Sequence, residues 1–301
     1  MRKVFLSLLL CGCALGAWAE TLYVATLRDY SNKETEGLGG ALYSVDSTTG
    51  KSKLVAQLRV GGLIPIGLTG LAIHPKTGVF YGITAGLSAQ IPRSLVTVDP
   101  KTGNTTLVGS LGHSASDIRF DTKGTLYAWL NEEARLATVD VGTGAATPIA
   151  GKSGYGDTLG GGLAIDRAGE FYVSATNAAG TLDRLDLATG QAIVGPRLTG
   201  APYISSINSL AFANGGTLYA VNSNLGAPSK SILVTIDTKT GAVKEIGPLP
   251  NDVDPLAFGP DRVDTEQSVI AQQPWGLLGA VAGGGLVLGF LLGMAFRRPT
   301  R

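Results

Sequence analysis

Five copies of a two-part sequence pattern fill the middle of this 301-residue chain. The first part is a strand with a tyrosine, preceded by a glycine turn in all copies but the first: Thr21-Leu22-Tyr23, Gly78-Val79-Phe80-Tyr81, Gly124-Thr125-Leu126-Tyr127, Gly169-Glu170-Phe171-Tyr172 and Gly216-Thr217-Leu218-Tyr219. The second part is a strand that ends in aspartate before a Thr-Gly turn, at Asp46, Asp99, Asp140, Asp186 and Asp237. These aspartates are 53, 41, 46 and 51 residues apart, which indicates one structural unit per copy.

A short apolar strand precedes the tyrosine strand in four of the copies. These strands are Leu71–Ile73, Ile118–Phe120, Leu163–Ile165 and Leu210–Phe212. A further strand follows each Thr-Gly turn, such as Lys53–Ala56 or Thr106–Gly109. Four short strands in each unit of about 45 residues predict an all-β fold, a five-bladed β-propeller over residues 20–262.

The first copy lacks the apolar strand, and its counterpart, Leu256–Phe258, follows the fifth copy instead. A ring made from a linear chain must close, and an innermost strand supplied from the C-terminal end would join the two ends of the ring. Such a strand also covers an edge that would otherwise be open to aggregation. An open sandwich or barrel is the alternative, but it would not explain the displaced strand.

The repeated Gly-x-Leu-Tyr and Val-Asp-x-x-Thr-Gly elements resemble those of secreted bacterial propeller repeat proteins, the NHL-like and YVTN-like group. The resemblance covers residues 21 to about 262. It implies the fold, but it does not imply one activity, because the group includes binding modules, scaffolds and some enzymes.

Residues 1–19 have the pattern of a secretory signal peptide. A basic start is followed by an apolar run from Val4 to Leu10 and by an Ala17-Trp18-Ala19 cleavage pattern before Glu20. A retained transmembrane helix and lipidation at Cys13 are the alternatives.

Trp275 to Phe296 forms a second apolar segment, 22 residues long and without a charge. As a helix it would be about 33 Å long, enough to cross a bilayer. Arg297, Arg298 and Arg301 follow it, which predicts a cytoplasmic tail at 297–301 and a body on the outer side. The polar residues 263–274 would then be a linker. Cleavage of this tail by a sorting protease is the alternative.

Gly285, Gly289 and Gly293 recur at every fourth residue of the apolar segment. This spacing places them on one helix face, where dimerisation is possible.

Charge and cysteine content exclude several classes of function. Five of the 24 basic residues belong to the two ends, which leaves 19 basic against 23 acidic residues, so we expect no nucleic-acid partner. Both cysteines, Cys11 and Cys13, lie in the predicted signal peptide. The body therefore has no disulfide, and with only His74 and His113 it can form no cysteine-protease or multi-histidine site.

The two faces of the predicted ring differ in their loops. The connections on one face are short and stereotyped, such as His74–Gly78. Those on the other face are long and irregular: 27–41, 59–70, 85–94, 151–162, 199–209 and 222–231. Rigid scaffolds carry recognition on variable loops, so we expect any binding site on this second face, the long-loop face.

The polar residues of the long-loop face are rich in carboxylates, amides and tyrosines. They are Asp29, Tyr30, Glu34, Glu36, His113, Asp117, Asn131, Glu132, Glu133, Tyr155, Asp157, Tyr203, Asn208, Asn222, Asn224, Asp252 and Asp254. Such groups suit calcium, a glycan or a protein partner, although solvated loops look similar. The candidate ligand-binding residues are Tyr30, His113, Asp117, Glu133, Tyr155, Asp157, Tyr203, Asn208 and Asp254.

Asp117 and Asp254 stand at the start of two innermost strands, near the ring axis. They could bind a cation in the central channel, or act as the acid and base of a hydrolase or lyase. Their registers differ by one residue, which would direct them to opposite strand faces. The sequence therefore favours a membrane-anchored binding module over an enzyme, with convergence of Asp117, Glu133, Asp157 and Asp254 on a pocket as the sign of an enzyme.

The aspartates before the Thr-Gly turns recur too regularly to form one site. We expect each to hydrogen-bond the backbone of its turn.

Overall fold

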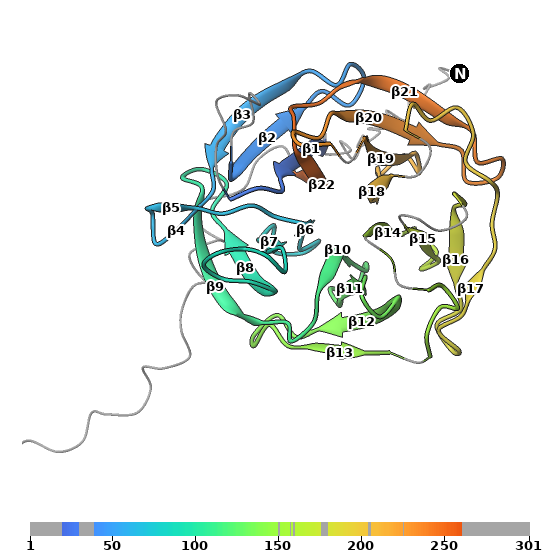
Figure 1. Ribbon diagram of the computed structural model, residues 1–301, viewed down its shortest axis with the longest axis horizontal. Coiled ribbons are helices and arrows are strands. Elements are labelled where there is room, and N and C mark those ends of the chain that lie inside the picture. Colours follow the sequence, from blue (N-terminus) through green and yellow to red (C-terminus); the bar gives the residue numbers. More distant parts are fainter. Residues whose placement is uncertain are drawn as a thin grey trace, which may run out of the picture.

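The computed structural model describes residues 20–29, 39–149, 151–156, 158, 160–175, 180–203, 206–224 and 226–260. Within them the chain is all-β, with 22 strands in five sheets. The sheets are arranged as blades around a central axis (Figure 1), so the predicted five-bladed propeller is confirmed.

Each blade has four antiparallel strands in order from the axis outward. The innermost strands of blades 1 to 5 are β22 (Val253–Pro260), β6 (Gly70–Ile73), β10 (Ala115–Phe120), β14 (Gly161–Ile165) and β18 (Ile207–Phe212). The second strands are β1 (Glu20–Thr26), β7 (Phe80–Ile83), β11 (Leu126–Leu130), β15 (Phe171–Ala175) and β19 (Leu218–Ser223). The third strands are β2 (Ala41–Val45), β8 (Ser94–Val98), β12 (Arg135–Val139), β16 (Asp183–Leu185) and β20 (Ser231–Ile236). The outer strands are β3 (Ser52–Gln57), β9 (Asn104–Ser110), β13 (Ala146–Pro148), β17 (Ala192–Ile193) and β21 (Val243–Pro248).

The ring closes as the sequence predicts. Strand β22, from the C-terminal end of the propeller, pairs antiparallel with β1, and Phe258 lies opposite Leu22. Blade 1 therefore contains strands from both ends of the repeat region, and its inner edge is covered.

Blade 2 departs from the predicted four strands. Residues 59–70, expected to be a loop of the long-loop face, contain a small hairpin of β4 (Arg59–Val60) and β5 (Ile64–Pro65). Strand β4 pairs in parallel with β9, so the sheet of blade 2 has six strands and the hairpin extends its outer edge. Two consecutive left-handed glycines, Gly61 and Gly62, make the tight turn between β4 and β5.

The core consists of five apolar clusters, one between each pair of neighbouring blades. The repeated tyrosine contributes to each interface, because its ring meets a phenylalanine of the next blade edge-on. The pairs are Tyr23–Phe80, Tyr81–Phe120, Tyr127–Phe171, Tyr172–Phe212 and Tyr219–Phe258, with ring centroids 4.8 to 5.5 Å apart. The repeat therefore encodes the packing between blades as well as the strands within them.

The aspartates of the Thr-Gly turns make the predicted backbone hydrogen bonds. In all five turns a carboxylate oxygen accepts the amide N–H two residues on, at 2.8 or 2.9 Å. Hydrogen bonds hold the pKa of Asp46, Asp140, Asp186 and Asp237 below the usual value: the hydroxyl of a turn threonine contributes most at Asp46 and Asp186, and backbone amides contribute most at Asp140 and Asp237.

His74 also accepts backbone amides, in a turn between an innermost and a second strand. Its Nδ1 accepts the amides of Lys76 and Thr77, both at 3.2 Å. Burial, and then the nearby Lys76 charge, lower the pKa of His74, which keeps this acceptor neutral. His74 is therefore a turn residue, as predicted.

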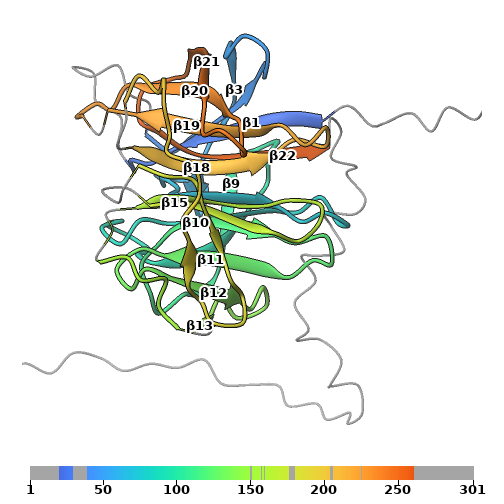
Figure 2. The ribbon, with the colours of Figure 1, turned by 90° about the vertical axis from the view of Figure 1, so that its right-hand side faces the viewer.

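The innermost strands all run from the long-loop face toward the opposite face, as β18 and β22 do in the side view (Figure 2). Their first residues therefore lie at the long-loop face, around the axis.

Both predicted membrane-related segments lie outside the described residues. These segments are the signal peptide at 1–19, and the linker, span and tail at 263–301 with the glycine stripe. Within the described residues, no helix is long and apolar enough to span a bilayer.

Candidate functional site

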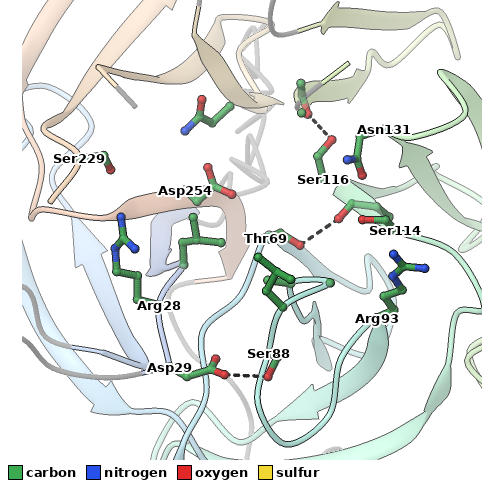
Figure 3. Close-up of a pocket in the computed structure, with 18 of the residues that line it drawn as sticks. Arg28, Asp29, Thr69, Ser88, Arg93, Ser114, Ser116, Asn131, Ser229 and Asp254 are labelled. Carbon is green, nitrogen blue, oxygen red and sulfur yellow. Dashed lines mark hydrogen bonds between the residues drawn. The ribbon is translucent and has the colours of Figure 1, made fainter. Parts of the chain in front are cut away.

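A cavity of about 650 Å³ opens around the axis on the long-loop face. Figure 3 shows its lining, with Thr69 and Asp254 near the middle and Arg28 and Arg93 on opposite sides. Residues from all five blades contribute to it, and its volume is typical of small-ligand sites. We call this cavity the axial pocket.

One position of the repeat supplies the inner lining of the axial pocket. The innermost strands share an apolar residue, which is Leu71, Ile118, Leu163, Leu210 or Leu256. Two residues before it stand Thr69, Ser116, Gly161, Asn208 and Asp254, and all five line the pocket. These five residues, one per blade, are called the axial ring below.

In four of the five blades, irregular backbone directs the axial ring residue toward the pocket. The pairing register shifts beside Ser116 on β10, beside Asn208 on β18 and beside Asp254 on β22. A β-bulge re-aims a side chain that regular alternation would point elsewhere. In blade 4 the ring position is Gly161, with a φ of 147°, and it presents its carbonyl group to Ser116, which donates to it at 2.9 Å.

Directly beneath the ring lies a buried ion pair between Asp117 and Arg119. Arg119 Nη1 is 3.0 Å from Asp117 Oδ1, and Nη2 donates to Oδ2 at 3.1 Å. The Asp117 carboxylate also accepts the backbone amides of Ile118 and Leu163 at 2.9 and 3.0 Å. Burial raises the pKa of Asp117 to about 6, whereas Arg119 and hydrogen bonds from Leu163, Leu210 and Ser209 oppose the rise.

This ion pair connects the innermost strands of all five blades. Arg119 donates to the carbonyl oxygens of Leu71 in blade 2 and Leu210 in blade 5, at 2.7 and 2.6 Å. Ser209 Oγ of blade 5 donates to Asp117 and accepts the amide of Leu256 in blade 1. With Leu163 in blade 4, the network joins every blade, and the guanidinium reaches across the axis below the pocket.

Asp254 is the carboxyl group of the axial ring. Its side chain is partly exposed to the pocket, and among the described residues no cationic side chain pairs with it. Burial in the protein, and then the charge of Asp117, raise the pKa of Asp254 well above its usual value, while a hydrogen bond with Asn208 opposes the rise. The carboxyl group is therefore protonated at a pH at which exposed aspartates are ionised.

Two arginines line opposite walls of the pocket, and each has an acidic partner. Arg28 Nε donates to Asp252 Oδ1 at 3.0 Å, and Arg93 Nη2 donates to Glu132 Oε1 at 2.9 Å. Arg93 and Asp252 both have left-handed backbones, with φ of 50° and 60°. Non-glycine residues rarely adopt this conformation, and it concentrates at functional sites.

A third wall is built around Asp29. Its carboxylate accepts the Gly67 amide at 2.7 Å, the Ser88 hydroxyl at 2.8 Å and the Ala89 amide at 3.1 Å. These bonds hold the segment that begins at Ala85 against the start of blade 1. Leu87 of that segment is 98% exposed at the pocket.

The predicted ligand-binding residues separate into three groups. Asn208 and Asp254 line the pocket, and Asp117 lies buried beneath it. His113, Glu133, Tyr155 and Tyr203 are described but do not line it. Tyr30 and Asp157, like Glu34 and Glu36, lie outside the described residues.

The residues that do not line the pocket have partners within the fold. His113 Nδ1 is 2.5 Å from Glu133 Oε1. Tyr155 donates its hydroxyl to Asp183 and meets Trp129 edge-on; burial and Asp183 raise the pKa of Tyr155. The backbone of Tyr203 is bound by the side chain of Asn222.

Sequence reasoning missed the polar ring residues Thr69 and Ser116, the pocket arginines and Arg119. The innermost strands held a signal for Arg119, because the equivalent residues in the other blades are Ala72, Ala164, Ala211 and Ala257. One arginine among four alanines near the axis indicates a side chain that fills the channel.

The channel cation, one of the alternatives that the sequence leaves open, stays a prediction. Among the described residues, no three histidine, cysteine, aspartate or glutamate side chains are grouped as metal ligands would be.

A repeat family described as a repeat of unknown function (DUF6923) matches residues 138–260, less than half of the chain. No curated protein matches. Among solved structures, a chain of a nidogen/laminin complex matches with 12% identity and a TM-score of 0.50, over 80% of this chain and 98% of that one. A protein of unknown function from Bacteroides caccae matches with 12% identity and a TM-score of 0.46, over 80% of this chain and 99% of that one.

At such low identity the nidogen/laminin match shows the fold alone. It agrees with the propeller resemblance that the sequence motifs indicated.

Proposed function

We propose that the protein is a non-enzymatic binding module whose axial pocket takes a small polar ligand, or a protruding group of a protein or glycan partner. The observation that carries the proposal is the pocket itself. It opens on the face with the long loops, and one repeat position in every blade supplies its inner lining. The Asp117–Arg119 pair beneath supports entry from the long-loop face, since Arg119 reaches across the axis.

The location of the protein is part of the proposal. The predicted signal peptide at 1–19 and the apolar segment at 275–296 would hold the propeller outside a cytoplasmic membrane, with residues 297–301 inside. The pocket would then sample ligands on the outer side.

A hydrolase or lyase is the second candidate, because Asp254 has the raised pKa of a general acid. The arrangement of the other carboxylates favours binding instead. Asp117 is fully buried and paired with Arg119, Asp29 is held by three donors, and Glu132 is paired with Arg93. Asp254 therefore lacks a second carboxylate that is free to act as base in the part of the chain that the structure describes.

The test is a thermal-shift panel on the full chain in detergent. The probes are alkylamines, amino acids, hexoses and dicarboxylates at millimolar concentration. In a filled-pocket variant, Ser114→Trp places a large ring in the pocket from a partly exposed position. In its matched control, Lys123→Trp adds the same ring to an exposed turn on the opposite face.

We expect at least one probe class to raise the melting temperature of the unmodified chain and of Lys123→Trp, and to have no effect on Ser114→Trp. Equal shifts in both variants, or no shift with any class, would overturn the proposal. Turnover of a hexose glycoside that is lost in Asp254→Asn would favour the enzyme.

A further inference from the structure

The floor of the axial pocket is rich in acceptors and lacks a cation. Asp254 has no cationic partner among the described residues, and its hydrogen-bond partner is the neutral amide of Asn208. The Asp254 carboxyl group is partly exposed in the pocket, so a ligand that donates hydrogen bonds can reach it.

Two hydroxyl groups of the axial ring add further acceptors. Thr69 donates its proton to the carbonyl of Ala115 at 3.0 Å, and Ser116 donates its proton to the carbonyl of Gly161 at 2.9 Å (Figure 3). With their protons engaged, both oxygens present lone pairs. The floor therefore offers one carboxyl group and the neutral oxygens of Thr69 and Ser116, and the positive charge at its base, Arg119, already pairs with Asp117.

This set of acceptors fits a monovalent nitrogen cation better than a divalent metal. Calcium takes six to eight oxygen ligands, several of them charged, whereas an ammonium group carries one charge and three donors. The arginines of the walls do not oppose it strongly, because Asp252 and Glu132 balance their charges.

The upper wall of the pocket is apolar and suits an alkyl stem. Leu27, Ala85, Leu87 and Ala89 line it. The leucine at the lip, Leu87, is exposed to solvent and would be covered by a ligand. A charged head at the floor and an apolar stem along this wall describe an alkylammonium group.

We propose that the axial pocket binds an alkylammonium group, with Asp254 as its counter-ion and Thr69 and Ser116 as neutral acceptors. The group belongs either to a free amine or to a lysine side chain of a partner. The proposal rests on the proposed function, because it names the ligand chemistry of the same pocket.

Binding is coupled to the release of a proton. The cation needs the Asp254 carboxylate, and burial favours the protonated form before the cation binds. Wherever that form is populated, its proton leaves to the buffer as the ion pair forms. Affinity for the cation therefore rises with pH until Asp254 is ionised in the empty protein. A neutral ligand of the same shape releases no proton.

The experiment is calorimetric titration of the full chain with n-butylammonium and with n-butanol, its neutral analogue. It is run in two buffers of different ionisation enthalpy. We expect n-butylammonium to bind with release of up to about one proton, a number that falls as pH rises, and n-butanol to bind at least about tenfold more weakly. Asp254→Asn should lose both the preference and the proton release, and Glu170→Gln, which removes an exposed carboxylate of the opposite face, should keep them.

The source of the group is tested with the peptide Ac-Gly-Lys-Gly-amide and its Nε-acetylated form. Tighter binding of the unacetylated peptide than of n-butylammonium assigns the site to a partner lysine, and weaker binding assigns it to a free amine.

Equal binding of n-butylammonium and n-butanol, an unchanged preference for n-butylammonium in Asp254→Asn, or binding of calcium in place of the amine would overturn the inference. In those cases the proposed function still holds if one probe class binds the unmodified chain and Lys123→Trp but does not bind Ser114→Trp. If no probe class loses binding in Ser114→Trp, both the proposed function and the alkylammonium inference fail.

Discussion

At the scale of single residues, the same side-chain chemistry has different consequences at the rim of the ring and at its axis. Asp140 is exposed, and two backbone amides of its turn bind its carboxylate. Asp254 is enclosed at the axis, with Asp117 nearby. Solvent and amide donors favour the ionised form of the first, and burial favours the protonated form of the second.

Replacing Asp140 with alanine removes the acceptor for the amides of Gly142 and Thr143. We expect the melting temperature to fall by a few degrees, and Asp140→Asn, which keeps a side-chain oxygen, to stay close to the unmodified protein. Scanning calorimetry at neutral pH measures both. An unchanged melt in Asp140→Ala would exclude the structural role of this turn.

The lowered pKa values of the turn aspartates predict how the stability of the fold changes at acid pH. A group whose pKa is lower in the folded state stabilises the fold above its unfolded value and loses that effect as pH falls through the folded value. We therefore expect stability to decline as pH falls below about 4, the ordinary aspartate range. Because Asp140→Asn lacks one such group, its decline should be shallower; an identical pH profile would contradict this.

Asp254 has the opposite effect on the pH dependence of stability, because burial raises its pKa in the folded state. Folding is then penalised as pH rises above the unfolded value, and the penalty grows until the folded value is passed. Asp254→Asn mimics the protonated group, so we expect it to gain stability relative to the unmodified chain with rising pH. For one proton the gain cannot exceed about 1.4 kcal/mol per pH unit. Urea unfolding from pH 5 to 8 tests this, and a constant difference would show that Asp254 does not titrate in that range.

At the scale of strands, the position of a residue in the repeat determines what its side chain does. The tyrosine of each second strand packs against the next blade, and in four of the five blades the axial ring residue lies beside a bulge or is a glycine. The tyrosines are visible in the sequence because they recur five times. The polar ring residues differ from blade to blade and are recognised only after the innermost strands are aligned on their shared apolar residue.

The hairpin of β4 and β5 could not be predicted for a different reason. Each of its strands has two residues, and Gly61-Gly62 between them has the composition of a loop. Strands this short produce no alternating pattern, so only their pairing with β9 reveals them.

The contact between Tyr219 and Phe258 lies at the interface where the ring closes, with ring centroids 5.3 Å apart. We expect Tyr219→Leu to lower the free energy of unfolding by about 0.5–1.5 kcal/mol, the usual contribution of an edge-to-face pair beyond its buried area. Tyr219→Phe keeps the ring and should remain near the unmodified value. Equal losses in the two variants would assign the effect to the hydroxyl group rather than to the ring contact.

At the scale of the whole molecule, the repeated pattern explains the ring of blades. The structure at the axis depends on Asp117 and Arg119, two residues that only one blade has at their positions. Blade number, ring closure and the face of the pocket all follow from the period, the displaced Leu256–Phe258 strand and the loop lengths. The Asp117–Arg119 pair does not, because its partners come from blades far apart in the chain and sequence spacing cannot place them.

Removing Arg119 tests the pair as a link between blades. Arg119→Ala leaves Asp117 buried without a counter-ion, and we expect a loss of about 3–5 kcal/mol in the free energy of unfolding. The double variant Asp117→Ser with Arg119→Ala copies Ser209 and Ala211 of blade 5 and buries no charge, so its loss should be smaller. Chemical denaturation compares the two, and a double variant at least as unstable as Arg119→Ala would contradict this account of the pair.

The central claim is that the protein works by binding a ligand in the axial pocket. Its most direct test uses the absence of cysteine from residues 20–301. With Cys11 and Cys13 replaced by serine, Ser114→Cys and, separately, Lys123→Cys are labelled with a trifluoromethyl group in the full chain. Fluorine resonances are then recorded while the low-molecular-mass fraction of a native cell extract is added. The whole extract, which also contains protein and glycan partners, is added in a second titration. The account predicts a saturable shift at position 114 and none at 123 in at least one of the two titrations; an unchanged resonance at 114 in both, or equal shifts at both positions, would contradict it.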